Sequence, residues 1–288
     1  SGAEAGLIGM LEETNLRVMS QQGFDERMEN LPDQTMKVEL LSAMLLSVES
    51  GQPQRLTVAN SRDKLLPSAH TQMVIPIPAG VDSRNAALAE TFASALHGIR
   101  LSGSEGGSVL VMGGGAIGLA AVRLLKLLGF SPIFLSEPVK EKRALGEQFG
   151  ADGMIDPLTE DIRRKGQEWT GGIGFETILE CSGVAENIPL AMEMAAKGGA
   201  ICMIGIIFSG VTLHQPMMMN FKEIRFTGSY SNTHEENIEC LKWMAEGKID
   251  ARPLISDLIS LEELPRVYQE RIHPGKSLKV MLRIGDEF

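Results

Sequence analysis

The chain has 288 residues, 43% of them hydrophobic and 22% charged, which is the composition of an ordinary globular protein with one large domain or two modest ones. Its formal net charge of −10, with no cluster of Lys and Arg, disfavours nucleic acid and anionic membrane surfaces as partners. Because no apolar run approaches the roughly 18 residues of a membrane-spanning helix and the first residues lack a signal-peptide pattern, we expect a cytoplasmic protein.

A glycine-rich turn is the first element that points to a function. Residues 108–112 (SVLVM) form a β-rich apolar run that is typical of a strand buried on both faces. The run leads directly into a G-x-G-x-x-G motif made of Gly113, Gly115 and Gly118, and from Ala116 the apolar residues recur with a helical period. Gly113 permits the turn, Gly115 lets a pyrophosphate approach the backbone, and Gly118 lets the helix pack on the strand. This order predicts a dinucleotide-binding turn.

The next strand ends in an acidic residue. Residues 131–136 (SPIFLS) lead into Glu137, which lies 19 residues past Gly118, where a carboxylate can accept hydrogen bonds from the adenosine ribose. A carboxylate would repel a 2′-phosphate, and no arginine immediately follows, so NAD is favoured over NADP. The alternative is a glycine-rich turn of an unrelated α/β protein with Glu137 as a solvated surface charge.

Strand and helix patterns alternate along the rest of the chain. The expected strands are 175–183, 200–206 and 221–231, and the expected helices are 185–199 and 234–249. This alternation predicts an α/β fold with a doubly wound parallel sheet and a ligand at the carboxyl ends of its strands.

From about Ser68 onward the chain resembles the medium-chain dehydrogenase/reductase superfamily, of the zinc alcohol, sorbitol and threonine dehydrogenase type. The resemblance rests on the glycine turn and, in order, on residues 86–100 (AALAETFASALHGIR), 137–152 (EPVKEKRALGEQFGAD), 228–250 and 275–282. It implies a Rossmann dinucleotide-binding domain at 94–230. It also implies a second domain, a reduced and mostly β GroES-like remnant at 1–93, to which residues 231–288 return.

The resemblance also implies where NAD would bind. The amides of Ala116 and Ile117 would hold the pyrophosphate, Glu137 the ribose diol, and Lys142 the adenosine side. A lysine late in the chain would approach the phosphates, and four residues would offer backbone groups to the nicotinamide carboxamide; these are Lys279 and then Ile204, Ile206, Ser229 and Ser231. Either lysine can also be read as a solvated surface charge.

The family's zinc ligands have no counterpart in this chain. Where relatives carry C-G-T-D or C-G-S-D, the resemblance places Leu46-Ser47-Val48-Glu49, so a leucine replaces the thiolate and a valine replaces the relay hydroxyl. Only 16 residues separate Gly51 from Ser68, too few for the family's G-H-E segment and structural zinc lobe. The cysteines have no C-x-x-C spacing and are predicted to be buried and reduced; they are Cys181, Cys202 and Cys240. We therefore predict no bound metal.

Two residues of the expected helix at 86–100 are candidates for catalysis. Glu90 lies near where some family members place a carboxylate at the metal, and His97 follows seven residues later on the same helix face. They are predicted to act as an acid and base pair in the nicotinamide cleft. The alternative is that His97 packs between helix and sheet.

These features predict a zinc-independent NAD(H)-dependent oxidoreductase acting on a small-molecule alcohol, carbonyl or enoyl group, in a biosynthetic pathway. The alternatives are an enzyme that uses tightly bound NAD in an epimerisation or elimination, and a non-catalytic sensor or scaffold. We also expect a homodimer, because residues 200–213 and the run 216–221 (PMMMNF) are more apolar than one domain needs. The methionine run could instead be core or a wall for an apolar ligand. The shortened barrel would leave a cleft that a bulky ligand, a second subunit or a protein partner closes.

Overall fold

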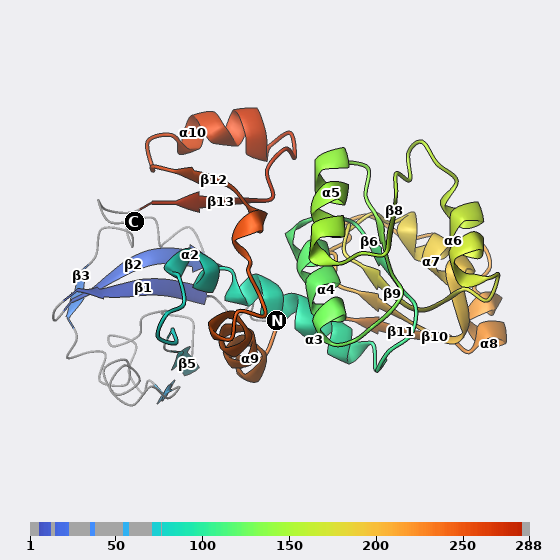
Figure 1. The fold of residues 1–288 in the computed structure, drawn as a ribbon, viewed down its shortest axis with the longest axis horizontal. Coiled ribbons are helices and arrows are strands. Elements are labelled where there is room, and N and C mark those ends of the chain that lie inside the picture. Colours follow the sequence, from blue (N-terminus) through green and yellow to red (C-terminus); the bar gives the residue numbers. More distant parts are fainter. Residues whose placement is uncertain are drawn as a thin grey trace. The chain divides into compact units, whose positions relative to one another are not determined.

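The computed structural model describes residues 6–12, 15–22, 35–37, 54–57, 71–75 and 77–283. The chain divides into two compact units, residues 1–87 with 284–288, and residues 88–283. The described part of the first unit is mostly β (Figure 1). It contains an antiparallel sheet of β1 (Gly6–Glu12), β2 (Asn15–Gln22) and β3 (Thr35–Lys37), an antiparallel pair of β4 (Gln54–Thr57) and β5 (Thr71–Val74), and the short helix α2 (Ser83–Ala86).

The second unit is built on a six-stranded parallel sheet with the order β11-β10-β9-β6-β7-β8. This is the strand order of a dinucleotide-binding Rossmann fold, in which the direction of winding reverses between the first and fourth strands. The predicted fold class is confirmed. The strands are β6 (Val109–Met112), β7 (Ile133–Ser136), β8 (Gly153–Ile155), β9 (Phe175–Glu180), β10 (Ala195–Met203) and β11 (Arg225–Gly228).

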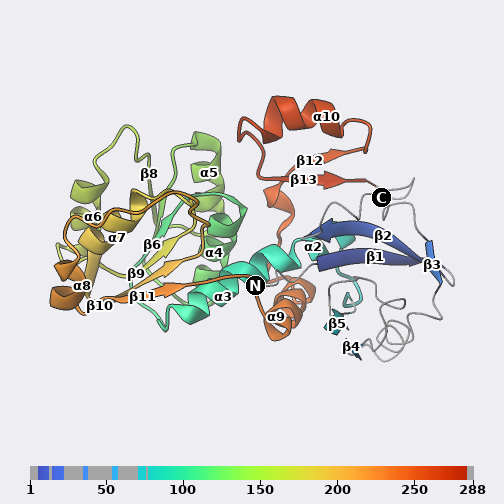
Figure 2. The same cartoon turned by 180° about the vertical axis from the view of Figure 1, so that it is seen from behind.

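Helices cover both faces of this sheet. In one group α3, α4 and α5 contact one another, and in the other α6, α7 and α8 do so; Figure 1 shows the groups on opposite sides of the strands, and Figure 2 shows the same from behind. Their bounds are α3 (Ala89–Leu101), α4 (Ala116–Leu127), α5 (Lys140–Phe149), α6 (Ile162–Thr170), α7 (Asn187–Met194) and α8 (Met217–Lys222). Among the residues described, none of the helices is long and apolar enough to cross a membrane.

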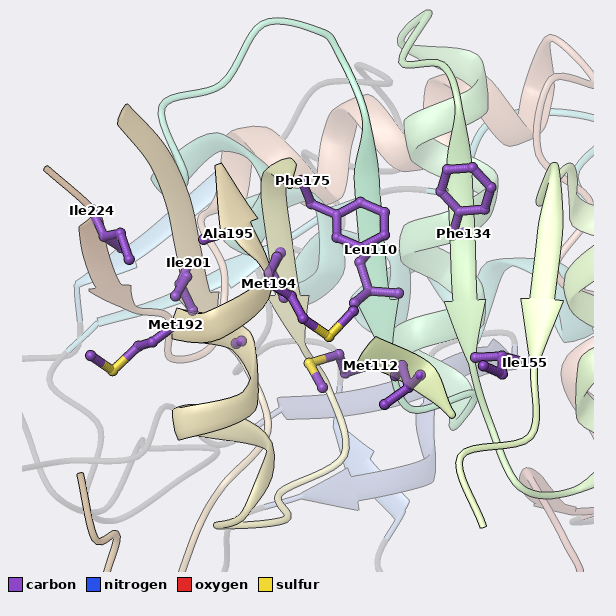
Figure 3. Packing of buried hydrophobic residues seen from close by; sticks show 13 residues of the cluster. Leu110, Met112, Phe134, Ile155, Phe175, Met192, Met194, Ala195, Ile201 and Ile224 are labelled. Atoms are coloured by element: carbon purple, nitrogen blue, oxygen red, sulfur yellow. The ribbon is translucent and has the colours of Figure 1, made fainter. Parts of the chain in front are cut away.

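The core lies between the sheet and the helices. All four residues of β6 are buried, as are all four of β7, which agrees with strands covered on both faces. Figure 3 shows Leu110, Phe175 and Met194 directed toward one another within one cluster of buried side chains. The ring of Phe134 stacks on Trp169 with a centroid distance of 4.3 Å and so closes the cluster beside β8.

One expected strand was drawn too long. Residues 217–222 form the helix α8, and β11 begins only at Arg225, because Glu223 ends the helix in the left-handed conformation at φ 53°. The Lys222 ammonium donates to the carbonyl oxygens of Glu193 (2.7 Å) and Ala195 (2.8 Å) at the end of α7, which fixes α8 there. Met218 and Met219 pack against the core cluster, so this part of the methionine run serves the core.

The last part of the second unit follows β11. A capping box between Thr233 and Glu236 starts α9 (His234–Ala245), which packs on α3. Beyond it lie a 3₁₀ turn (Arg252–Leu254), β12 (Ile255–Ile259), α10 (Leu264–Val267), a π-helical turn (Tyr268–Ile272) and β13 (Lys279–Leu282), which pairs in parallel with β12. Residues 231–283 thus belong to the same compact unit as the sheet. The expected bounds of 1–93 and 94–230 differ from this division and stay a prediction.

Candidate cofactor site

The glycine turn joins β6 to α4 at the carboxyl edge of the sheet. Gly113 has φ 102°, and its N–H donates to the carbonyl oxygen of Ser136 at 2.8 Å, which ties the turn to β7. A Cβ at Gly118 would overlap the carbonyl oxygen of Gly113, so α4 can pack this closely on the turn only with glycine there. A Cβ at Gly115 would meet nothing within 4 Å, so the outer side of the turn is open. These are the positions that the motif predicted for close packing and for ligand approach.

The first turn of α4 offers free donors. Its N-cap is Gly115, which provides no side-chain hydrogen bond. Within the described residues, the N–H groups of Ala116 and Ile117 have no acceptor in the protein. Unpaired N–H groups at a helix N-terminus, together with the positive end of the helix dipole, form an anion-binding position. The protein itself therefore leaves this site free for a group such as a pyrophosphate.

Glu137 lies beside the turn but is not a solvated surface charge. Only 5% of the residue is exposed, and its carboxylate accepts from the N–H of Gly114 at 2.6 Å and of Val139 at 2.8 Å. The guanidinium of Arg143 donates to the carbonyl oxygens of Glu137 and Pro138 at 2.6 and 2.7 Å. Glu137 therefore closes the glycine turn, and its contact with a ribose stays a prediction.

The two lysines expected near the cofactor form no bonds with the residues of the glycine turn in the described part of the chain. The Lys142 ammonium donates to the carbonyl oxygen of Gly275 at 3.5 Å, and Lys279 is a partly exposed residue of β13. In the part of the chain that the structure describes, no hydrogen bond or ion pair joins either lysine to the glycine turn or to Glu137. Their contacts with a dinucleotide remain predictions.

The residues expected at the nicotinamide lie at the carboxyl ends of β10 and β11. The N–H groups of Ile204 and Ser229 already donate to the carbonyl oxygens of Glu180 and Met203, both at 2.8 Å. They cannot also serve a ligand, so any backbone contact there would come from other groups of this segment. Ile206 is 60% exposed, and Ser231 adopts the left-handed conformation at φ 62°.

A second buried carboxylate, which we did not predict, lies between the glycine turn after β6 and the segment after β10. Glu180 ends β9 with 0% exposure, and its carboxylate accepts from the N–H of Ser182 at 2.8 Å, from the Ser182 hydroxyl, and from the N–H of Gly183 at 3.1 Å. Its carbonyl oxygen accepts from Ile204 and Gly205. The only available signal was an acidic residue that ends an otherwise apolar strand.

The structure does not bring Glu90 and His97 together. Glu90 accepts from the Ser94 hydroxyl at 2.9 Å and from the Asn232 amide at 3.2 Å. His97 Nδ1 lies 3.1 Å from Glu236 Oε1 on α9, so its imidazole is engaged by the neighbouring helix. Each residue thus has structural partners, and a catalytic role for either stays a prediction.

Comparison with known proteins agrees with this geometry. The family model of zinc-binding dehydrogenases matches residues 116–246. Scyllo-inosose 3-dehydrogenase of Thermotoga maritima is 33% identical over 178 residues (60% of this chain and 45% of that protein), and sorbitol dehydrogenase of Halalkalibacterium halodurans is 32% identical over 216 residues (72% and 60%). The matched part of the chain belongs to the medium-chain dehydrogenase/reductase superfamily.

Solved structures of this superfamily match the same part. A zinc-binding dehydrogenase from Sinorhizobium meliloti bound to NADP superposes with a TM-score of 0.68 at 31% identity, covering 75% of this chain and 65% of that one. L-idonate 5-dehydrogenase from Escherichia coli gives a TM-score of 0.65 at 27% identity, with 75% and 62% covered. The chain spans about half to two thirds of the length of these relatives.

Zinc ligation, common in this superfamily, finds no support in the described residues. No group of three His, Cys, Asp or Glu side chains is arranged there to hold a metal ion. Burial raises the pKa of the Cys181 thiol well above its ordinary value, with the Glu180 charge adding to the effect, and burial raises the pKa of Cys202 to about 11. Such thiols stay protonated at neutral pH and are weak nucleophiles. The segment Leu46-Ser47-Val48-Glu49, the interval 52–67 apart from β4, and His70 lie outside the described residues.

Proposed function

We propose that this protein is an NAD(H)-dependent oxidoreductase acting on a small-molecule alcohol, carbonyl or enoyl group. The observation that carries the proposal is the pair of free N–H groups of Ala116 and Ile117 next to Glu137, at the carboxyl edge of a Rossmann sheet. Its relatives' names, among them sorbitol dehydrogenase and L-idonate 5-dehydrogenase, support a polyol or sugar-acid substrate class.

The residues of the turn fit a dinucleotide. The Ala116 and Ile117 amides would bind the pyrophosphate, and Glu137 would accept from the ribose hydroxyls, since each carboxylate oxygen retains a lone pair beyond its bond to an N–H group. Bound NAD would supply or accept the hydride. We propose NAD over NADP because the Glu137 carboxylate would repel a 2′-phosphate, and because Arg143 donates to the carbonyl oxygens of Glu137 and Pro138 and lies 3.4 Å from Asp156. These contacts direct the guanidinium toward the Glu137 backbone and Asp156, which disfavours its pairing with a 2′-phosphate.

We further propose that the reaction proceeds without zinc. The leucine and valine at positions 46 and 48 support this, and hydride transfer itself needs no metal. The substrate proton would then pass through a side chain, for which Glu90 with its neighbours Ser94 and Asn232, and His97, are the candidates.

One observation favours a second candidate function. Glu90 and His97 are both engaged by structural partners, and the residue in place of the zinc-binding cysteine is Leu46. A member with these features could bind NAD without net redox turnover, either as a sensor or scaffold or in an epimerisation or elimination with tightly bound cofactor.

A homodimer is the proposed assembly. The edge strand β11 and the segment before it carry exposed apolar side chains, with Phe208 95% and Phe221 74% exposed. Unpaired strand edges and exposed aromatics of this kind are usually covered in the working protein. A protein partner that closes the cleft is the alternative assembly, and the cytoplasm, where Cys181, Cys202 and Cys240 would stay reduced, is the proposed location.

The experiment that tests the function starts with near-ultraviolet absorbance and fluorescence of the purified protein. Bound nicotinamide at that stage supports the tightly bound cofactor, while its absence followed by saturable NADH binding supports an exchangeable one. Incubation with NADH and candidate polyols or ketones then detects hydride transfer. Binding of NADH without transfer to any of a broad substrate panel favours the sensor, and failure to bind either nucleotide overturns the proposal.

A further inference from the structure

Glu180 is a buried charge that the proposed reaction leaves unused. It lies at the carboxyl end of β9, the strand next to β6 and its glycine turn. The turn after Glu180 touches Gly113, since a Cβ on that glycine would come within 2.9 Å of Ser182. On the other side Gly205 packs against Glu180, because its Cβ would lie 2.7 Å from Glu180 Oε2. Glu180 therefore lies between the expected pyrophosphate and nicotinamide positions.

The hydrogen bonds around Glu180 are those of an ionised carboxylate. The Ser182 hydroxyl accepts from the N–H of Val184 at 3.0 Å and from the Asn187 amide at 2.8 Å, so its one hydrogen points to Glu180. The other neighbours of the carboxylate are the N–H groups of Ser182 and Gly183, which can only donate. Donors alone stabilise the negative charge. Among the described residues no Lys, Arg or His forms an ion pair with it.

We propose that Glu180 sets the preference of this site for the oxidised over the reduced cofactor. The inference rests on the proposed function and on the expected position of the nicotinamide beside Ile204 and Ile206, next to Glu180. The nicotinamide ring carries a positive charge when oxidised and none when reduced. A buried anion without a cation of its own attracts the oxidised ring more strongly than the reduced one, and low solvent access preserves this attraction.

The test is the ratio of the dissociation constants of NAD⁺ and NADH. Binding of NADH is followed by its fluorescence, and NAD⁺ is measured by displacement of NADH. Glu180→Gln keeps the shape and removes the charge, and we expect the ratio to move against NAD⁺ by about threefold to tenfold, from the attraction of unit charges at protein-like dielectric. The matched control is Glu176→Gln, which makes the same charge change at the other end of β9, where Glu176 accepts from Ser108. It should leave the ratio unchanged.

A second variant tests the opposite direction and keeps the hydrogen bonds of the buried site. Val184 is 45% exposed, and its contribution to the turn is its N–H, which donates to the Ser182 hydroxyl. Val184→Asp adds a negative charge two residues after Ser182, and we expect a shift toward NAD⁺ of about twofold, smaller because solvent screens it. If Glu180→Gln does not fold, this variant still tests whether a negative charge in this turn acts on the charge state of the bound cofactor.

The outcomes separate the inference from the proposed function. If the unmodified protein binds neither nucleotide, the proposed function fails. If it binds both, and Glu180→Gln weakens both equally or leaves both unchanged, Glu180 is only a structural residue and the inference is overturned. A Val184→Asp variant with an unaltered ratio would count against it in the same way.

Discussion

The glycine turn and the contact between α3 and α9 both contain polar groups that the sequence singles out, but the two regions use them differently. In the turn, the N–H groups of Ala116 and Ile117 have no protein acceptor within the described residues. In the helix contact, His97 is bonded to Glu236, and Glu90 to Ser94 and Asn232. Free donors on an open turn indicate a ligand site, whereas mutually satisfied groups between two helices indicate structure.

Among the substitutions that test this comparison, Gly118→Ala is expected to have the largest effect on stability. The added Cβ overlaps the Gly113 carbonyl oxygen, which is rigid backbone, so α4 must move off the turn. We expect a loss of about 3 kcal/mol or more in the free energy of unfolding, as for overpacked core positions. Urea unfolding followed by circular dichroism measures it.

The matched control for that substitution is Gly115→Ala, three residues earlier in the same turn. Its Cβ meets nothing within 4 Å and its φ of −68° suits alanine, so the loss of stability should be only about 0.5 to 1 kcal/mol, from the preference for glycine over alanine at an N-cap. The methyl group lies where the pyrophosphate approaches, and NADH affinity should fall by about tenfold or more. An unchanged NADH affinity of Gly115→Ala would show that the open side of the turn is not a ligand site.

The opposite behaviour is expected from Glu236→Ala in the helix contact. The substitution removes the buried acceptor of His97 and of the Thr233 N–H, which should cost about 2 to 3 kcal/mol of unfolding free energy. NADH affinity of the folded protein should stay within about twofold, because no free donor is lost. Glu239→Ala, which removes only the exposed partner of Arg100, is the control and should cost well under about 1 kcal/mol. A Glu236→Ala variant that folds normally but no longer binds NADH would show that the helix contact is part of the cofactor site.

Glu137 both stabilises the fold and is expected to bind the cofactor. Its substitution should therefore reduce both stability and NADH affinity. Glu137→Ala leaves the N–H groups of Gly114 and Val139 without their acceptor, so we expect a loss of about 1 to 2 kcal/mol of stability. NADH affinity should fall by about tenfold and NADPH affinity by less, because the carboxylate no longer repels a 2′-phosphate. Parallel fluorescence titrations with both nucleotides measure this, and equal affinity of the unmodified protein for the two would contradict the assignment of NAD.

The sequence predicts features whose residues are close together along the chain, and it does not predict contacts between residues far apart. Gly113, Gly115 and Gly118 lie next to a buried strand, so their spacing alone predicts strand, turn and helix. The bond between His97 and Glu236 joins residues 139 apart, and no pattern along the chain indicates such a pair.

The helix α8 and the buried carboxylate of Glu180 were missed for the same reason. The short helix α8 was not predicted, and its last two residues were assigned to a strand, because its position depends on Lys222 reaching the end of α7. Glu180 gave no motif, since only the folded turns around it show that its carboxylate is buried. Groups defined by distant partners could not be read from sequence.

The smallest effect is expected from a chelator. It tests whether the hydrogen-bonded residues of the α3–α9 contact bind a metal ion. Glu90, nearest to the family's metal position by resemblance, already accepts from Ser94 and Asn232, and no other candidate ligands gather around it in the described residues. A single carboxylate does not hold zinc, which needs three protein ligands. The purified protein should therefore contain substoichiometric zinc by elemental analysis, and EDTA should leave its melting temperature and NADH affinity unchanged, with added zinc as the control. Stoichiometric zinc whose removal abolishes NADH binding or activity would mean that Glu90, with His97 or His70, forms a rebuilt metal site, and that the bonds seen at Glu90 and His97 serve catalysis rather than helix packing.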